Sequence, residues 1–315
     1  FRGYQLVCAP PPASGAAVFL PIMKALEDES FGGGPLRTAE NLDRIGRVWR
    51  VVSPEMWRIV ADVPASRFLF EKLLAPDSIR AIRAKAFAAE PQRKVARGGR
   101  APPPARREGA TGPAWAAPEN EPFYESAMAA TTHFVVVDAL GNIVCATQSL
   151  SLHFGAGVVP PGTGVVMNNS MSNFNYTDAN ELNYISPGKR SRSTIAPTIV
   201  LRDGKPVLAV GVPGSARIPT ALLQVLLDRL VLNRPLAEAI GDTRVHYAAT
   251  FRRDEVEEFE AEQSFPAAVA DGMRARGWKV DLPEVAGRGR HFGGVNAIEF
   301  NRDGTLTGYA DPRRT

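Results

Sequence analysis

The junction Ala129-Ala130-Thr131-Thr132 holds the strongest candidates for catalytic residues in this sequence. A threonine hydroxyl in mid-chain is a poor nucleophile. If the Ala130–Thr131 peptide bond were cut, Thr131 would gain a free α-amine with a pKa of about 7.7 to 8.0, able to act as general base for its own hydroxyl. On the residues alone, a self-activating N-terminal nucleophile and an ordinary strand start both stay open.

The elements that must position this junction follow it directly. Residues 134–137 and 143–147 flank a Gly-Asn turn and predict a β-hairpin. Residues 198–210 predict a second hairpin, turned at 202–205. Apolar residues from Ile218 to Leu230 have the spacing of an amphipathic helix. Antiparallel strands with packed helices predict an α+β layered domain.

Residues 1–90 have a different texture and are expected to be mostly helical. Thr38-Ala39-Glu40-Asn41 is typical of a helix start, and residues 78–86 are good helix formers. We therefore divide the chain into residues 1–90, a linker over 91–130 and a catalytic part over 131–315.

The linker carries the charge surplus of the chain. Residues 91–120 hold six basic and two acidic residues together with six prolines and four glycines, and the formal net charge of the whole chain is +4. Such a composition is typical of a flexible linker. Nucleic-acid binding would need interleaved aromatic residues, and this stretch has only Trp115, so we expect no nucleic-acid partner.

Composition excludes several other classes. With 315 residues, 44% hydrophobic, the chain can bury a substantial core, and two cysteines cannot form a disulfide framework. No apolar run reaches the roughly 20 residues of a membrane span. The four histidines lack metal-ligand spacing, so we expect no metal, and residues 187–191 lack the glycine pattern of a phosphate loop. Because the chain opens with Phe1 and shows no signal segment, we expect a fragment or processed chain.

Several motifs together resemble a known family. They are Thr131-Thr132-His133-Phe134, Asn168-Asn169, Pro187-Gly188-Lys189-Arg190, Ala196-Pro197-Thr198, Pro213-Gly214 and Asp311-Pro312-Arg313. Their order and spacing over 131–315 resemble the small subunit of the γ-glutamyltranspeptidase family, and residues 1–15 resemble a late segment of its large subunit. The resemblance implies an N-terminal-nucleophile hydrolase with a four-layer αββα sandwich, matured by autocleavage and needing no cofactor.

Carried over, the resemblance makes Thr131 the nucleophile, first in autoproteolysis and then on the substrate amide. Ser149 stands where the family usually has a threonine whose hydroxyl contacts the nucleophile; its alternative is a strand-end serine bonded to backbone. Gly214 and Ser215 stand where two glycines usually supply oxyanion N–H donors. Serine can supply the same backbone donor, and the alternative there is a plain turn before a helix.

The resemblance also implies substrate contacts, with departures. Ser193 and Thr194 match a serine pair that holds the substrate α-carboxylate, although a capping role is the alternative. Ser170 and Asn173 stand where glutamyl-binding members commonly have glutamine and aspartate on the α-ammonium, and Ser151 replaces an asparagine that assists. Loss of the acid should weaken ammonium recognition by about tenfold or more.

The sequence therefore predicts a γ-glutamyltranspeptidase-like enzyme that cleaves γ-glutamyl amides of the glutathione type through a Thr131 acyl-enzyme and transfers the acyl group to water or an amine. An acyl hydrolase of the same superfamily, with glutaryl-type or secondary-metabolite substrates, and a non-catalytic binding module are the alternatives. The expected partners are a small-molecule amide and the chain's own large-subunit portion. A periplasmic or extracellular location follows from the resemblance alone.

Overall fold

The computed structural model describes residues 1–88, 129–248, 258–282 and 292–314. Of the linker predicted over 91–130, residues 91–128 lie outside these ranges, and the last two residues, Ala129 and Ala130, begin strand β2 (Ala129–Val137). The first described part is one strand and four helices: β1 (Tyr4–Cys8), α1 (Gly15–Ala25), α2 (Ala39–Ile59), α3 (Pro64–Leu73) and α4 (Pro76–Phe87). The helix start predicted at Thr38 is confirmed, because its side chain accepts a hydrogen bond of 3.1 Å from the Asn41 N–H.

A five-stranded antiparallel sheet forms the centre of the molecule. Its order is β1-β4-β5-β9-β10, with β4 at Thr198–Arg202, β5 at Lys205–Gly211, β9 at Asn296–Phe300 and β10 at Leu306–Ala310. The predicted β4–β5 hairpin is confirmed: Asp203 and Gly204 have φ of 52° and 76°, as a two-residue primed turn requires. Strand β1, which periodicity did not reveal, joins the sheet by pairing with β4.

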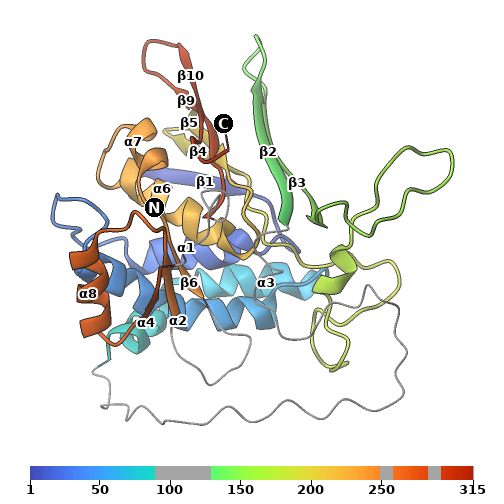
Figure 1. Ribbon diagram of the computed structural model, residues 1–315, viewed down its shortest axis with the longest axis horizontal. Helices are drawn as coiled ribbons and strands as arrows, with labels where there is room; N and C mark the ends of the chain where they lie inside the picture. The colour runs from blue at the N-terminus through green and yellow to red at the C-terminus, as the bar shows by residue number, and fades with distance from the viewer. Residues whose placement is uncertain (89–128, 249–257, 283–291, 315) are drawn as a thin grey trace.

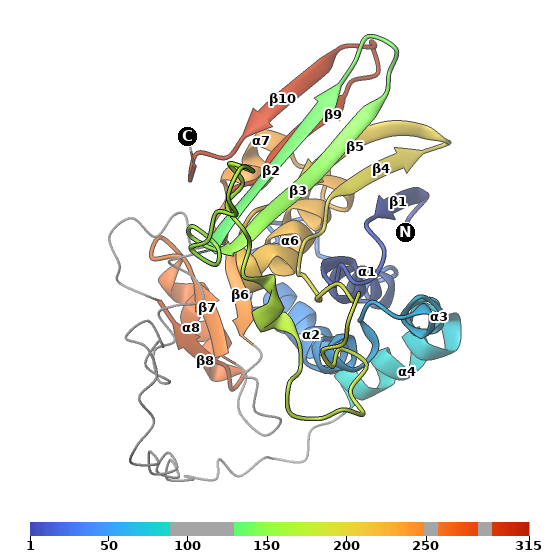
Figure 2. The same ribbon diagram turned by 90° about the vertical axis from the view of Figure 1, so that its right-hand side faces the viewer.

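The other predicted hairpin packs face to face with this sheet (Figures 1 and 2). It consists of β2 (Ala129–Val137) and β3 (Ile143–Leu152) and contacts β5 and β9. The approach is close at Gly211, where an added Cβ would lie 2.3 Å from the His133 ring. Glycine at that point lets the two sheets meet.

Helices cover the opposite face of the five-stranded sheet (Figure 2). Helix α6 (Ile218–Leu230) lies beneath it and packs on α1 and on α7 (Leu236–Gly241). The predicted helix is confirmed, but its amphipathic character is wrong, since twelve of its thirteen residues are buried, including Gln224 and Asp228. The sheet on one side and α1, α7 and β6 (Val245–Ala248) on others leave α6 almost no face toward solvent.

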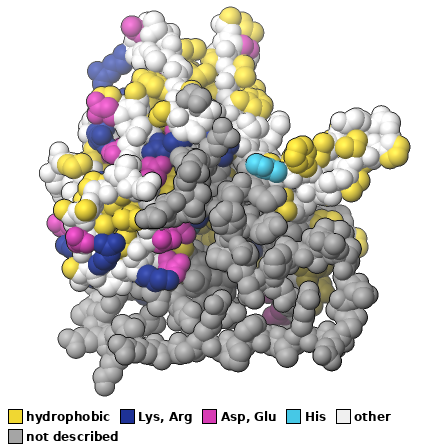
Figure 3. Space-filling model, in the orientation of Figure 1, with side chains coloured by type: hydrophobic (Ala, Val, Ile, Leu, Met, Phe, Trp, Pro, Cys, Tyr) yellow, Lys and Arg dark blue, Asp and Glu magenta, His cyan; other side chains and the backbone are white. Residues whose placement is uncertain are grey.

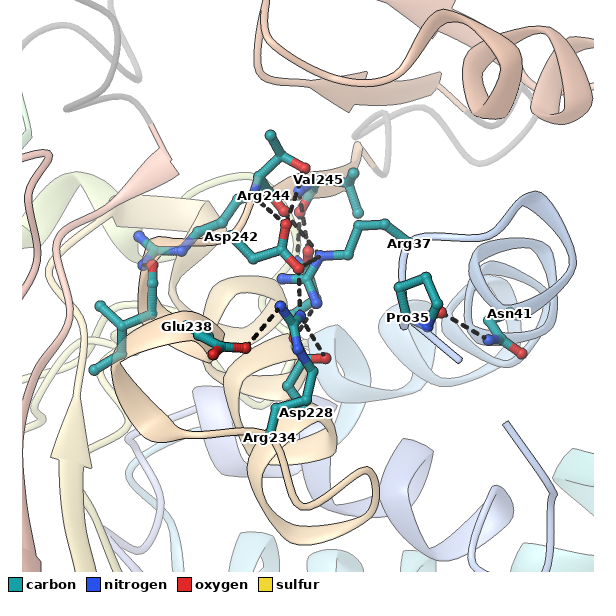
Figure 4. Close-up of polar contacts among 12 residues, drawn as sticks. Pro35, Arg37, Asn41, Asp228, Arg234, Glu238, Asp242, Arg244 and Val245 are labelled. Atoms are coloured by element: carbon teal, nitrogen blue, oxygen red, sulfur yellow. Dashed lines mark hydrogen bonds and ion pairs between the residues drawn. The ribbon is translucent and has the colours of Figure 1, made fainter. Parts of the chain in front are cut away.

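Burying Asp228 requires compensating charge. Arg37, which precedes α2, forms an ion pair with the Asp228 carboxylate, and Arg234 approaches it at 3.3 Å (Figure 4). Arg234 also pairs with Asp242. Burial raises the pKa of Asp228, and the two arginines oppose that shift. The network joins the first part of the chain to the second.

A three-stranded sheet completes the described residues. It orders β6 (Val245–Ala248), β7 (Glu258–Ala261) and β8 (Lys279–Asp281), with α8 (Ala267–Ala275) beside it. Aromatic rings of Trp49, Tyr247, Phe259 and Trp278 pack it against α2. No helix in the described ranges is both long and apolar enough to cross a bilayer.

The layers observed are therefore hairpin, sheet and helices. Over the described residues the outer face of the β2–β3 hairpin is uncovered (Figure 1), and Phe134, Val136 and Val144 are exposed on the hairpin. The loop that follows β3 projects from the body, and hydrophobic side chains gather along it (Figure 3). The mixed sheets and helices agree with the α+β class.

Candidate active site

A β-bulge lies at the junction that could carry chemistry. Ala130 pairs with Ser151 but Thr131 pairs with Ser149, so Leu150 has no partner on β2. The Leu150 carbonyl instead accepts a hydrogen bond of 3.1 Å from the Asn169 N–H. The bulge interrupts the regular ladder at the Ala130–Thr131 peptide bond.

The bulge brings two hydroxyls together. Thr131 Oγ1 and Ser149 Oγ are 2.9 Å apart, and Ser149 Oγ lies 3.4 Å from the Ala130 carbonyl oxygen. The Ser149 oxygen also accepts a bond of 2.9 Å from the Ser151 N–H, which fixes its position. One serine hydroxyl thus contacts both the candidate nucleophile and the carbonyl of the candidate scissile bond.

The backbone of Thr131 is held from the C-terminal end of the chain. Arg314 Nη1 donates a hydrogen bond of 3.1 Å to the Thr131 carbonyl. The Arg314 stem packs on Gly294, where an added Cβ would lie 2.5 Å from it. Thr131 itself is 7% exposed, so its hydroxyl faces a sheltered space.

Behind Thr131 the hairpin is apolar and neutral. Burial lowers the pKa of His133 to about 4, so its ring is uncharged at neutral pH, and Nδ1 lies 2.8 Å from Thr147 Oγ1. Burial also raises the pKa of Cys145 to about 11. A thiol with so high a pKa is unreactive.

A tight turn precedes α6 on the facing wall. Gly214 precedes the short 3₁₀ helix η2 (Ser215–Arg217), and Ser215 adopts a φ of 52°, which few non-glycine residues occupy. Neither N–H of this pair, Gly214 or Ser215, donates a hydrogen bond to the described residues. Unbonded N–H groups at a helix entrance favour an anionic oxygen.

These features meet in a cavity of about 920 Å³. All the predicted site residues except Gly214 line it: Thr131, Ser149, Ser151, Ser170, Asn173, Ser193, Thr194 and Ser215. Gly214 directly precedes Ser215. It lies close to Gly293, because a Cβ added at Gly214 would be 3.1 Å from the Gly293 Cα. Within the described residues, no group of three or more histidine, cysteine, aspartate or glutamate side chains could hold a metal.

Comparison with known proteins places the chain in a family. The family model described as gamma-glutamyltranspeptidase matches residues 1–315. The chain belongs to the γ-glutamyltranspeptidase family.

Its similarities run to both hydrolases and acylases. The chain is 32% identical over 320 residues to an acylase ACY 1 proenzyme of Pseudomonas sp. (strain SE83) and 29% identical over 333 residues to the glutathione hydrolase proenzyme of Escherichia coli (strain K12), covering 98% and 99% of this chain. It spans about half the length of these relatives, 49% and 50%. A cephalosporin acylase from Bacillus halodurans has the same fold, with a TM-score of 0.75 at 23% identity, covering 99% of this chain and 50% of that one.

In this member of the γ-glutamyltranspeptidase family, the hydroxyls of Ser193 and Thr194 have different hydrogen-bond partners. Thr194 Oγ1 donates a hydrogen bond of 2.9 Å to the Ser215 carbonyl, so it fixes the turn before α6. Ser193 Oγ accepts a long contact of 3.5 Å from the Ile195 N–H and keeps its own proton free to donate. Of these two residues, Ser193 is therefore the one whose hydroxyl is available to donate into the cavity.

The short helix η1 (Ser170–Asn173) carries two of the positions, Ser170 and Asn173, at which the sequence was expected to depart from glutamyl-binding members of the family. Its neighbours tie it to β3, because the Leu152 N–H donates to Asn169 Oδ1 at 3.2 Å. The Asn173 carbonyl accepts 2.7 Å from Asn183 Nδ2. The Asn173 side chain makes no hydrogen bond to the described residues and lines the cavity.

Sequence reasoning missed several lining residues, and those from α2 come from a segment distant in the chain. Helix α2 contributes Trp49, Met56 and Trp57. Arg217 and Glu260 also line the cavity and form an ion pair of 2.6 Å with each other. Arg192, which directly precedes Ser193, also lines it. An arginine directly before the hydroxyl pair was the available signal.

Proposed function

We propose that this chain is the catalytic half of an N-terminal threonine hydrolase or acyltransferase acting on γ-glutamyl or related amides. The observation that carries the proposal is the 2.9 Å contact between Thr131 Oγ1 and Ser149 Oγ, at a bulge that opens on a large cavity. Family membership supports the reaction class. The four-layer αββα sandwich, with its outer helical layer, and the division at residues 90 and 130 belong to the same proposal.

Maturation begins with Thr131 as an internal nucleophile. Its Oγ1 attacks the Ala130 carbonyl carbon, the C–N bond breaks, and the hydroxyl proton passes to the departing nitrogen. Ser149, 3.4 Å from the Ala130 oxygen, donates to the negative charge that develops there. Water then hydrolyses the ester and leaves Thr131 with a free α-amine.

Substrate cleavage uses the same oxygen. The α-amine takes the Thr131 hydroxyl proton, Oγ1 attacks the substrate amide carbon, and the Gly214 and Ser215 N–H groups stabilise the oxyanion. The α-amine of Thr131 passes the proton to the nitrogen of the substrate amide, the substrate C–N bond breaks, and the released amine leaves behind an acyl-enzyme ester on Oγ1. Water or a second amine resolves this ester. Ser149 holds the Thr131 oxygen during both steps.

The acyl specificity is proposed from the polar residues that line the rest of the cavity. In this proposal Ser193 donates to a substrate carboxylate, while Ser151, Ser170 and Asn173 line the space for its other substituents. Without the usual aspartate, Asn173 presents a carboxamide, so an acyl group lacking an α-ammonium is favoured. The 32% identity to an acylase proenzyme favours this second candidate, an acyl hydrolase with altered specificity.

The test uses the full-length parent protein and its Thr131→Ala variant. Denaturing electrophoresis of the wild type should give two bands, with threonine at the new N-terminus, and the variant should give one. Mass spectrometry after a slow acylating substrate should place the adduct on Thr131. An uncut wild-type band, or a variant that still cuts, supports the non-catalytic binding module instead.

A further inference from the structure

Arg192 occupies an unusual position in the cavity wall. Its guanidinium lies over the Trp57 ring, 4.0 Å from the centroid, and Nη1 donates to the carbonyls of Trp57 at 2.9 Å and Val60 at 3.4 Å. These contacts join the loop before Ser193 to the last turn of α2. The guanidinium plane is thereby fixed against the wall, and Arg192 is still one of the residues that line the cavity.

Arg192 lacks a carboxylate partner. It forms no ion pair with any of the described residues, whereas the neighbouring Arg190 is paired with Asp62 at 2.8 Å and Arg217 with Glu260 at 2.6 Å. Glu181 acts on Arg192 only through its field, and burial lowers the pKa of Arg192 to about 10. A half-buried cation without a counter-ion favours a bound anion.

The charges of the cavity point the same way. Among its described lining residues Arg217 and Glu260 neutralise each other, and Asn173 brings no charge, so Arg192 is the cation left over. The adjacent Ser193 hydroxyl is free to donate. We propose that Arg192 binds a carboxylate of the substrate in the cavity of Thr131, an inference that rests on the proposed function.

Two sources could supply this carboxylate: the far end of the acyl group, or the amine that leaves. Three anilides separate them. Glutaryl p-nitroanilide carries the carboxylate on the acyl group, valeryl 3-carboxy-4-nitroanilide carries it on the leaving group, and valeryl p-nitroanilide carries none. The processed parent protein is compared with Arg192→Met, Arg192→Lys and the matched control Arg190→Met.

Arg192→Met should lower kcat/KM for one carboxylated anilide by about tenfold or more, mainly through KM, and change valeryl p-nitroanilide less than twofold. Arg192→Lys should restore part of the loss, and Arg190→Met should change neither. The carboxylated anilide that responds identifies the source. An equal loss on all three anilides means that Arg192 only clamps α2, and no loss on any means that it faces no substrate; either result overturns the proposal.

A binding measurement separates this proposal from the proposed function. Glutarate and 5-amino-2-nitrobenzoate, the two carboxylate-bearing fragments, are titrated into Thr131→Ala protein while tryptophan fluorescence reports on Trp57, with and without Arg192→Met. Saturable binding of one fragment that weakens about tenfold or more with Arg192→Met supports the carboxylate site even if no amide is cleaved. Binding that is absent, or unchanged by the substitution, contradicts it even if Thr131 proves catalytic.

Discussion

The cavity has two sides of different construction. The nucleophile side, residues 129–152, is a long hairpin pressed on a five-stranded sheet, and its key contact is fixed by strand register. The substrate side, residues 168–194, is mostly loop, where polar side chains bond to nearby backbone. The groups proposed to break bonds are thus set by strand pairing within the hairpin, whereas the groups proposed to select the substrate lie on loops and can be exchanged at little cost to the fold.

The largest expected effect is on the nucleophile side and concerns the free energy of unfolding at acid pH. Buried His133 has its pKa lowered to about 4, against about 6.5 when unfolded, so between these values the unfolded chain binds more protons. The free energy of unfolding should therefore fall by about 3 kcal/mol from this group as pH drops from 6.5 to 4. Urea unfolding across this pH range measures it.

Two variants isolate the contribution of His133 to the pH dependence of unfolding. His133→Gln removes the titrating ring and should flatten the pH dependence relative to wild type, even if the protein is less stable at neutral pH. His153→Gln changes an exposed histidine on the projecting loop and should keep the wild-type slope. Equal slopes for all three proteins would show that His133 does not carry the acid sensitivity.

Next in size is the loss of the second hydroxyl. Ser149→Ala removes the partner of Thr131 Oγ1 and the donor near the Ala130 oxygen, so autocleavage and kcat should each fall by about 100-fold. Ser149→Thr keeps the hydroxyl and should retain both. Band intensities over time and anilide turnover give the two rates. A Ser149→Ala protein that matures at the wild-type rate would reduce Ser149 to a strand-end serine.

Substitutions on the substrate side should change which substrate is preferred, and the enzyme should still cleave amides. Asn173→Asp places a carboxylate in the cavity, and a charge-assisted hydrogen bond to an α-ammonium should raise the kcat/KM ratio of γ-glutamyl to glutaryl p-nitroanilide by about tenfold. Asn180→Asp adds the same charge at an exposed loop position and should leave the ratio unchanged. If wild type already prefers the glutamyl anilide by a large factor, the inference from Asn173 is wrong.

Local sequence predicted the hairpins and the Thr38 helix start, because turn and capping residues act over short distances. The candidate site residues came from the family resemblance, since they are spread over positions 131–215 and no local pattern joins them. It did not predict β1, whose pairing with β4 joins residues nearly 200 positions apart. Nor did it show that Arg192 would stack on Trp57, since their hydrogen bond spans 135 positions. The burial of α6 was missed for the same reason: Gln224 bonds to the backbone of Val245, and Asp228 pairs with Arg37 from the first part of the chain.

The smallest expected effect concerns the turn at Gly214 and Ser215, directly before α6. Ser215 holds a φ of 52°, a conformation that costs a non-glycine residue about 1 kcal/mol, so Ser215→Gly should raise the free energy of unfolding by up to about that amount. The donor proposed there is a backbone N–H, and glycine keeps it, so kcat/KM should stay within about threefold. Urea midpoints and anilide turnover measure the two effects. A tenfold loss of activity without loss of stability would mean that the Ser215 side chain, and not only its backbone, contacts the substrate.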